Sequence, residues 1–153
     1  RGNFFYGENK NVIGADLGIM VSNTKETFAG IALAGLVNIT GKQAYVIGLQ
    51  AAGLANVNRD KAYVLGVQVA GLFNSINGDG AIYGAQVAAF GNFASKTDIY
   101  GLQVGLYNKA KRVVGAQIGL LNFADNLHGI QIGALNFSNH GLLGVSPILN
   151  LGF

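Results

Sequence analysis

The residues best suited to polar chemistry are six glutamines that recur at one position of a repeat. Each stands two residues after a Gly in the motif G-x-Q-x-(G/A). The six are Gln50, Gln68, Gln86, Gln103, Gln117 and Gln131, and Asp16 takes the same position in the first copy. A Gln amide offers two donor hydrogens and an acceptor oxygen. Aligned glutamines can therefore bond to one another and to water, which is the chemistry of an internal polar network.

Asp16 is the one charged residue that falls inside a predicted strand. An unpaired buried carboxylate is costly, so one interpretation pairs Asp16 with a cation or a basic residue in the protein interior. The other interpretation is a solvated or protonated acid near a frayed first strand. The sequence leaves both open.

No other residues form a reactive constellation. His128 and His140 lie near predicted turns, neither has a second His or a carboxylate at metal-ligand spacing, and Cys is absent. Ser138 and His140 are close in sequence, but they would share one face only if a strand continued through the turn that is predicted there. We therefore expect no catalytic residue, no metal site, no cofactor and no enzymatic activity.

The charged segments are short and lie between the repeats. "NGDG", residues 77–80, predicts a tight turn. "NKAKRV" holds Lys109, Lys111 and Arg112, which could contact acidic headgroups, although a solvated turn is the simpler interpretation. The net charge is +3, but Lys and Arg are scattered. This is not the clustered basic face of a nucleic-acid-binding protein, so no nucleic-acid partner is expected.

Strands must position the glutamines, because apolar residues alternate with small or polar ones inside each repeat. In the fourth copy, one face carries Tyr63, Leu65, Val67, Val69, Gly71 and Phe73, and the other carries Val64, Gly66, Gln68, Ala70, Leu72 and Asn74. The copies start at Gly14, Gly30, Gly48, Gly66, Gly84, Gly101, Gly115, Gly129 and Gly144, so their spacing falls from 18 residues to 14. An Asn closes most copies.

The composition is unusual for a soluble globular domain. The length of the chain predicts that residues 1–153 form a single repeat-built β domain. Of its residues, 50% are hydrophobic and 11% are charged, whereas typical soluble domains have roughly 25% charged residues. No apolar run approaches the roughly 20 residues of a membrane helix. The polar surface expected of an ordinary globule is therefore missing.

Two architectures suit such a repeat. In a β-solenoid each repeat is one coil and equivalent residues stack in ladders, with Leu and Val columns as the core. In an antiparallel meander each repeat is one strand, and the meander closes into a small transmembrane β-barrel of about 8–10 strands. The drifting spacing and strands of about ten residues favour the barrel. Its lumen would hold the Gln belt and Asp16, and would not be an open pore.

Aromatic residues bracket the apolar face. Tyr63 and Phe73, and likewise Tyr83 and Phe93, are ten residues apart and share a face. A tilted strand of that length spans roughly 25 Å, the height of an outer-membrane apolar band. The four residues are therefore predicted to form an aromatic girdle against the lipid bilayer.

The last ten residues, "GVSPILNLGF", alternate and end in Phe153. They resemble the closing strand of bacterial outer-membrane β-barrels, and this resemblance implies that Phe153 is a C-terminal assembly signal for the barrel-assembly machinery. The G-x-Q-x-G-x-x-N repeat also resembles that of bacterial surface-repeat proteins, which implies a surface location.

These observations together predict a bacterial outer-membrane protein with a structural, accessory or surface role. Its partners would be the bilayer and other outer-membrane proteins or a larger complex. The alternative is a secreted, extracellular β-solenoid that binds a surface or forms fibres.

Overall fold

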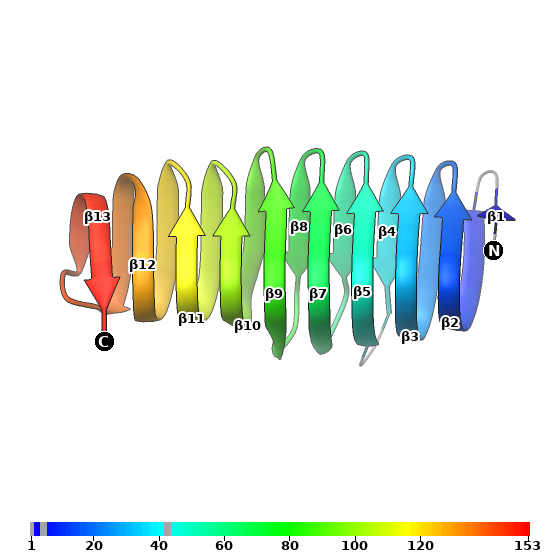
Figure 1. Cartoon of the computed structure of the whole chain (residues 1–153), viewed down its shortest axis with the longest axis horizontal. Coiled ribbons are helices and arrows are strands. Elements are labelled where there is room, and N and C mark those ends of the chain that lie inside the picture. Colours follow the sequence, from blue (N-terminus) through cyan, green and yellow to red (C-terminus); the bar gives the residue numbers. More distant parts are fainter. Residues whose placement is uncertain (1, 4–5, 42–43) are drawn as a thin grey trace.

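The structure is a computed structural model that describes residues 2–3, 6–41 and 44–153. All of its regular elements are strands, stacked side by side along one long axis (Figure 1). In chain order the strands are β1 (Gly2–Asn3), β2 (Tyr6–Gly18), β3 (Val21–Ala34), β4 (Val37–Thr40), β5 (Ala44–Ala52), β6 (Ala55–Asn58), β7 (Ala62–Ala70), β8 (Phe73–Ile76), β9 (Gly80–Ala88), β10 (Gly91–Val104), β11 (Tyr107–Ile118), β12 (Leu121–His140) and β13 (Val145–Gly152). The described chain holds no helix that is long and apolar enough to cross a membrane.

The fold is a parallel β-solenoid of about seven turns. Strands one repeat apart pair in parallel and in register, as β5 does with β7 and β7 with β9. The predicted antiparallel meander, and with it the closed transmembrane barrel, is therefore wrong. One repeat contributes a whole coil to the stack, whereas a barrel would use it as a single strand.

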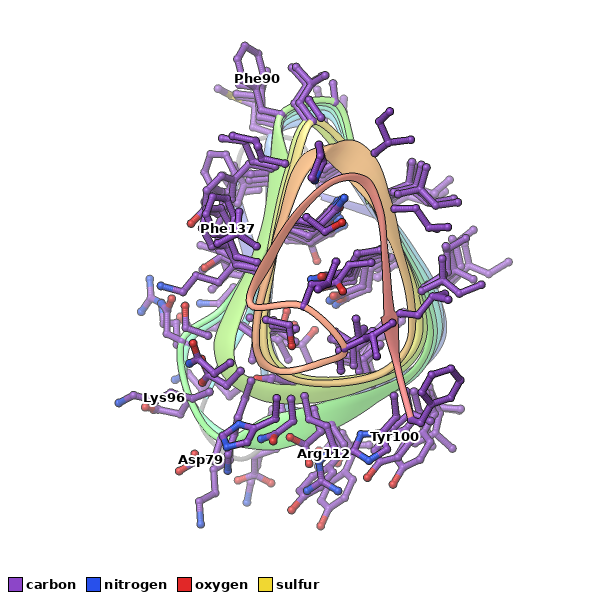
Figure 2. The ribbon with its side chains drawn as sticks, turned by 90° about the vertical axis from the view of Figure 1, so that its left-hand side faces the viewer. Asp79, Phe90, Lys96, Tyr100, Arg112 and Phe137 are labelled. Atoms are coloured by element: carbon purple, nitrogen blue, oxygen red, sulfur yellow. The ribbon has the colours of Figure 1, made fainter. Side chains whose placement is uncertain are left out.

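Each coil has a flat side, an apolar corner, a second side and a charged edge. The flat side holds the long strands β5, β7 and β9, and the second side holds the short strands β4, β6 and β8. Each of the strands β3, β10, β11 and β12 runs through both sides in one continuous element. Figure 2 looks along the axis, with Phe90 at the apolar corner and Asp79 and Lys96 along the charged edge.

The shorter repeats keep the strand register of their neighbours, because the residues that they lack come from the bulge at the charged edge. At the charged edge, Ala94 pairs with Ala110 and Asp98 pairs with Arg112, so four steps in one coil match two steps in the next. Register is restored immediately, and Gly101 pairs with Gly115. The spacing drift that favoured a barrel is therefore a local narrowing of the coil at its charged edge.

The interior contains a narrow apolar column beside two polar ones. Stacked residues of the flat side form the apolar column, namely Val46, Val64, Ile82, Ile99, Val113 and Leu127, all completely buried. Small alanines such as Ala70 and Ala88 fill the space below the apolar corner. The Leu and Val columns that the solenoid alternative placed in the core lie outside, with Leu65 47% and Val69 38% exposed.

A column of glycines holds the coils close together. Gly66 has φ +142°, a backbone conformation that L side chains rarely adopt. A Cβ at Gly66 would lie 1.9 Å from the carbonyl oxygen of Gly48 in the preceding coil. Only glycine fits there, and a positive φ recurs at the first glycine of each repeat from Gly14 to Gly129.

The C-terminal strand closes the stack differently. β13 pairs with β12 in antiparallel orientation, with Gln131 opposite Asn150. Ile148 has φ 67°, directly after Pro147. This irregular, reversed strand covers the last coil and serves as a terminal cap of the kind that repeat proteins require.

Candidate functional site

The six predicted glutamines form one continuous hydrogen-bonded ladder inside the solenoid. Gln68 Nε2 donates to Gln50 Oε1 over 2.7 Å, and each following Gln donates to the one before it over 2.7–2.9 Å. Asn150 of the cap donates to Gln131 Oε1 over 3.2 Å and continues the ladder. The bonds run along the axis, from one coil to the next.

A second ladder of asparagines runs beside the first. Asn56 Nδ2 donates to Asn74 Oδ1 over 2.8 Å, and the pattern continues through Asn92, Asn108, Asn122 and Asn136. The same Asn56 nitrogen also donates to the carbonyl oxygen of Val69 over 2.8 Å. That backbone carbonyl fixes which end of the amide faces which neighbour.

The two ladders point in opposite directions. Gln amides donate toward the N-terminus and Asn amides donate toward the C-terminus. Because a buried polar group costs free energy when it is unpaired, these chains of bonds make a polar interior compatible with folding. Their amides are satisfied by one another, which makes the interior a structural spine.

Asp16 lies in the same column but outside the ladder. It is completely buried and accepts a hydrogen bond from the Ser22 hydroxyl. Ala32 occupies the column between Asp16 and Gln50, so the amide ladder begins at Gln50. This burial does not fit a solvated acid, whereas the pairing of Asp16 with a cation or a basic residue and its protonation both stay predictions.

The four aromatic residues of the predicted girdle lie on two outer sides of the coil, with Tyr63 and Tyr83 on the flat side and Phe73 and Phe93 on the second side. Tyr63 stacks on Tyr45, with ring centroids 5.6 Å apart, at the flat side near the charged edge. Tyr83 stacks in the same way on Tyr100, at 4.8 Å. Phe73 and Phe93 meet edge to face on the second side, at 6.4 Å. In a solenoid these rings form ladders along the axis, and they do not bracket a membrane-spanning band.

The second-side aromatic ladder is longer than the sequence suggested. Phe93 contacts Tyr107, Tyr107 contacts Phe123, and Phe123 stacks on Phe137 at 4.5 Å. Figure 2 shows Phe137 on the outer surface of this side. Stacked outer rings of this kind stabilise the coil spacing and leave an apolar, aromatic strip exposed.

Phe153, the predicted assembly signal, follows the capping strand and is 92% exposed. The strand before it closes a solenoid, whereas the predicted signal belonged to the last strand of a barrel. The ring itself projects freely from the end of the stack.

The charged edge carries ion pairs between coils. Arg112 lies 3.0 Å from the Asp98 carboxylate, and Lys10 lies 3.3 Å from that of Glu26. His128 and His140 are exposed, and no group of three metal-ligating side chains occurs in residues 2–3, 6–41 and 44–153. This edge is a solvated polar surface.

The most distinctive surface is the outward side of the flat strands, here called the flat face. It comprises Ile47, Leu49 and Ala51 of β5 and the residues that pair with them in the other coils. Its members are aliphatic or Tyr apart from His128 at one end, and many are more than one-third exposed. Sequence periodicity identified these residues as one apolar face, but assigned that face to lipid or to the core.

The apolar surface continues around the corner. Leu54, Leu72, Phe90, Leu106 and Leu120 line it, and each is at least 37% exposed. The solenoid therefore buries two amide ladders beside its apolar column and is apolar over much of its outside, with most of its charge gathered on one edge. Comparison of the chain with protein families, with curated proteins and with solved structures finds no match.

Proposed function

We propose that this chain is a non-enzymatic structural protein of the bacterial cell surface, which acts by applying its apolar exterior to another apolar surface. The observation that carries the proposal is that many large apolar side chains lie on the outer surface while columns of Gln and Asn are buried. Two columns of amides are buried in the interior, while Leu65, Ile118 and Phe90 are 47%, 40% and 61% exposed. Contiguous exposed apolar surfaces of this size mark interaction sites.

The interior supports a structural role over a catalytic one. Most of its polar groups are unreactive amides that bond to one another, and apart from the buried Asp16 most acidic and basic side chains lie on the solvated charged edge. The likeness of the repeat to bacterial surface-repeat proteins supports an extracellular location. A stiff rod with an apolar side is suited to coating or joining surfaces.

Detergent phase partitioning tests the proposal. The purified protein should enter the detergent-rich phase of a cloud-point detergent. A triple variant, Leu65→Lys, Val67→Lys and Ile130→Lys, should shift to the aqueous phase with an unchanged β-sheet circular dichroism spectrum, because these side chains point outward. A matched control with Lys61→Ala, Lys96→Ala and Lys111→Ala on the charged edge should partition as the native protein does. A native protein that stays in the aqueous phase and binds no apolar dye would contradict the proposal.

A further inference from the structure

The flat face is close to a plane, because the strands of the flat side lie side by side with little twist along the axis (Figure 1). The paired residues keep one register through β3, β5, β7, β9, β10, β11 and β12 on this side, so Gly30, Gly66 and Gly115 belong to one column. Sheets that lie flat over many strands are unusual, and stacking against another sheet typically stabilises them. Two such planes pack about 10 Å apart.

The area of the flat face is close to the area that one partner contributes to a stable protein–protein interface. Strands spaced about 4.8 Å apart give it a length of roughly 35 Å, and its three outward positions per strand give a width of about 20 Å. The resulting area of roughly 700 Å² is close to the ~800 Å² that each partner contributes to a standard interface. One face of this protein is therefore large enough to hold a partner by itself.

The relief of the face is suited to contact with an identical face. In its middle column, Leu102 stands between Ala85 and Ala116. A large side chain thus lies between two small ones, so a projecting position has a lower position on each side of it. In an isologous contact the same patch serves both subunits, so it must offer projections and recesses together. Its rim is polar, with Asp98 and Arg112 along the charged edge.

From these observations we propose that the flat face binds the flat face of a second copy of this chain, giving a two-fold dimer with a dry aliphatic interface. This inference rests on the proposed function and names the surface that the exterior engages. A lipid bilayer is the competing occupant. It fits less well, because β13 pairs only with β12 among the described strands, and unpaired strand edges are not tolerated in hydrocarbon.

Sedimentation velocity in detergent-free buffer tests the pairing. The native chain should sediment as a dimer. The double variant Val67→Lys and Leu102→Lys places like charges across the two-fold axis and should raise the dimer Kd at least ~100-fold. Leu72→Lys adds the same charge at the apolar corner, outside the flat face, and should leave the dimer intact.

A second measurement covers the case in which the double variant does not fold. The chain has no Cys, so a short bifunctional maleimide should join two copies of the single variant Leu102→Cys, while it should not join two copies of Leu72→Cys. A linker is needed because facing sheets lie about 10 Å apart, farther than a disulfide spans. A native dimer that survives both lysines, or that crosslinks at Leu72→Cys in place of Leu102→Cys, would overturn the pairing.

Vesicle flotation separates failure of the pairing from failure of the proposed function. A native monomer that floats with phosphatidylcholine vesicles would overturn the dimer and retain an apolar surface role, with lipid as the occupant. A native monomer that neither floats nor enters a detergent phase would overturn both. A native dimer that is lost with Val67→Lys and Leu102→Lys and kept with Leu72→Lys supports both.

Discussion

Gln68 donates a hydrogen bond to Gln50 over 2.7 Å, and the two side chains are 0% and 2% exposed. The residues are 18 positions apart in sequence but occupy equivalent places in adjacent coils. Side chains bonded in this way specify the register, because a slip of one residue would move every amide of a strand to the outer face. The ladder thus links the repeat in the sequence to the parallel stack.

Breaking the ladder in its middle should weaken the fold. In the variant Gln86→Met, a side chain of similar size removes the acceptor of Gln103 and the donor to Gln68. Two buried groups then lose their partners, each at about 1–3 kcal/mol, so we expect the free energy of unfolding to fall by roughly 2–6 kcal/mol. Urea denaturation measures it, with the outward Val87→Thr as the control. An equal effect of the two substitutions would mean that the ladder adds no stability.

The Asn ladder can be tested without a change of size. Asn74 Nδ2 donates to Asn92 Oδ1 over 2.9 Å and to the carbonyl oxygen of Val87 over 3.0 Å. Asn74→Asp removes both donors and aims a buried negative charge at these oxygens. We expect a loss of about 3–5 kcal/mol at pH 7.

The pH dependence of that variant follows from its burial. The folded-state pKa of the introduced carboxyl is raised above its unfolded value, because burial and nearby oxygens disfavour the charge. The destabilisation is then full at neutral pH and fades as the pH falls through the raised pKa. Denaturation at pH 7 and pH 4.5, relative to the native chain, checks the sign. Asn77→Asp on the exposed charged edge is the control, and a pH-independent loss would contradict this explanation.

The alternation within each strand could be predicted from the sequence. Val64, Gln68 and Asn74 share one face and Leu65, Val67 and Val69 share the other, as their period of two indicates, and the structure places them inside and outside respectively. Charges were predicted at turns, and most of them do lie along one edge. Local periodicity carries this information because it depends only on the pleat of the strand.

The direction of pairing could not be predicted in the same way. A parallel coil and an antiparallel meander both bring Gln68 and Gln86 to the same height, so the repeat itself does not separate them. The distinguishing signals were the second strand hidden inside each repeat, such as β8, and the positive φ of the glycines. Neither is visible as an alternation of hydrophobicity. The composition also misled, because an apolar exterior was equated with lipid.

The glycine column offers a test that separates strain from collision. A methyl group at Gly66 meets both an unfavourable φ and the Gly48 carbonyl oxygen, whereas at Gly14 nothing lies within 4 Å. Gly14→Ala should therefore lower the free energy of unfolding by about 1–3 kcal/mol through backbone strain alone. Gly66→Ala should cost more than this, and we expect it to block folding into the stack. The comparison uses thermal and urea unfolding, and equal effects at both positions would argue against close contact between the coils.

The parallel register of the coils is the central claim, and distances between paired spin labels test it most directly. Leu65 pairs with Tyr83 in the solenoid, so labels at Leu65→Cys and Tyr83→Cys should couple strongly at under ~10 Å, since adjacent strands lie about 4.8 Å apart. The measurement requires dilution with unlabelled protein, so that only pairs within one chain contribute. In an antiparallel meander Leu65 would face Ala89, and the Leu65–Tyr83 labels would be roughly 20 Å apart. Strong coupling at Leu65 and Tyr83 is the result we predict, and strong coupling of Leu65→Cys with Ala89→Cys would contradict the solenoid.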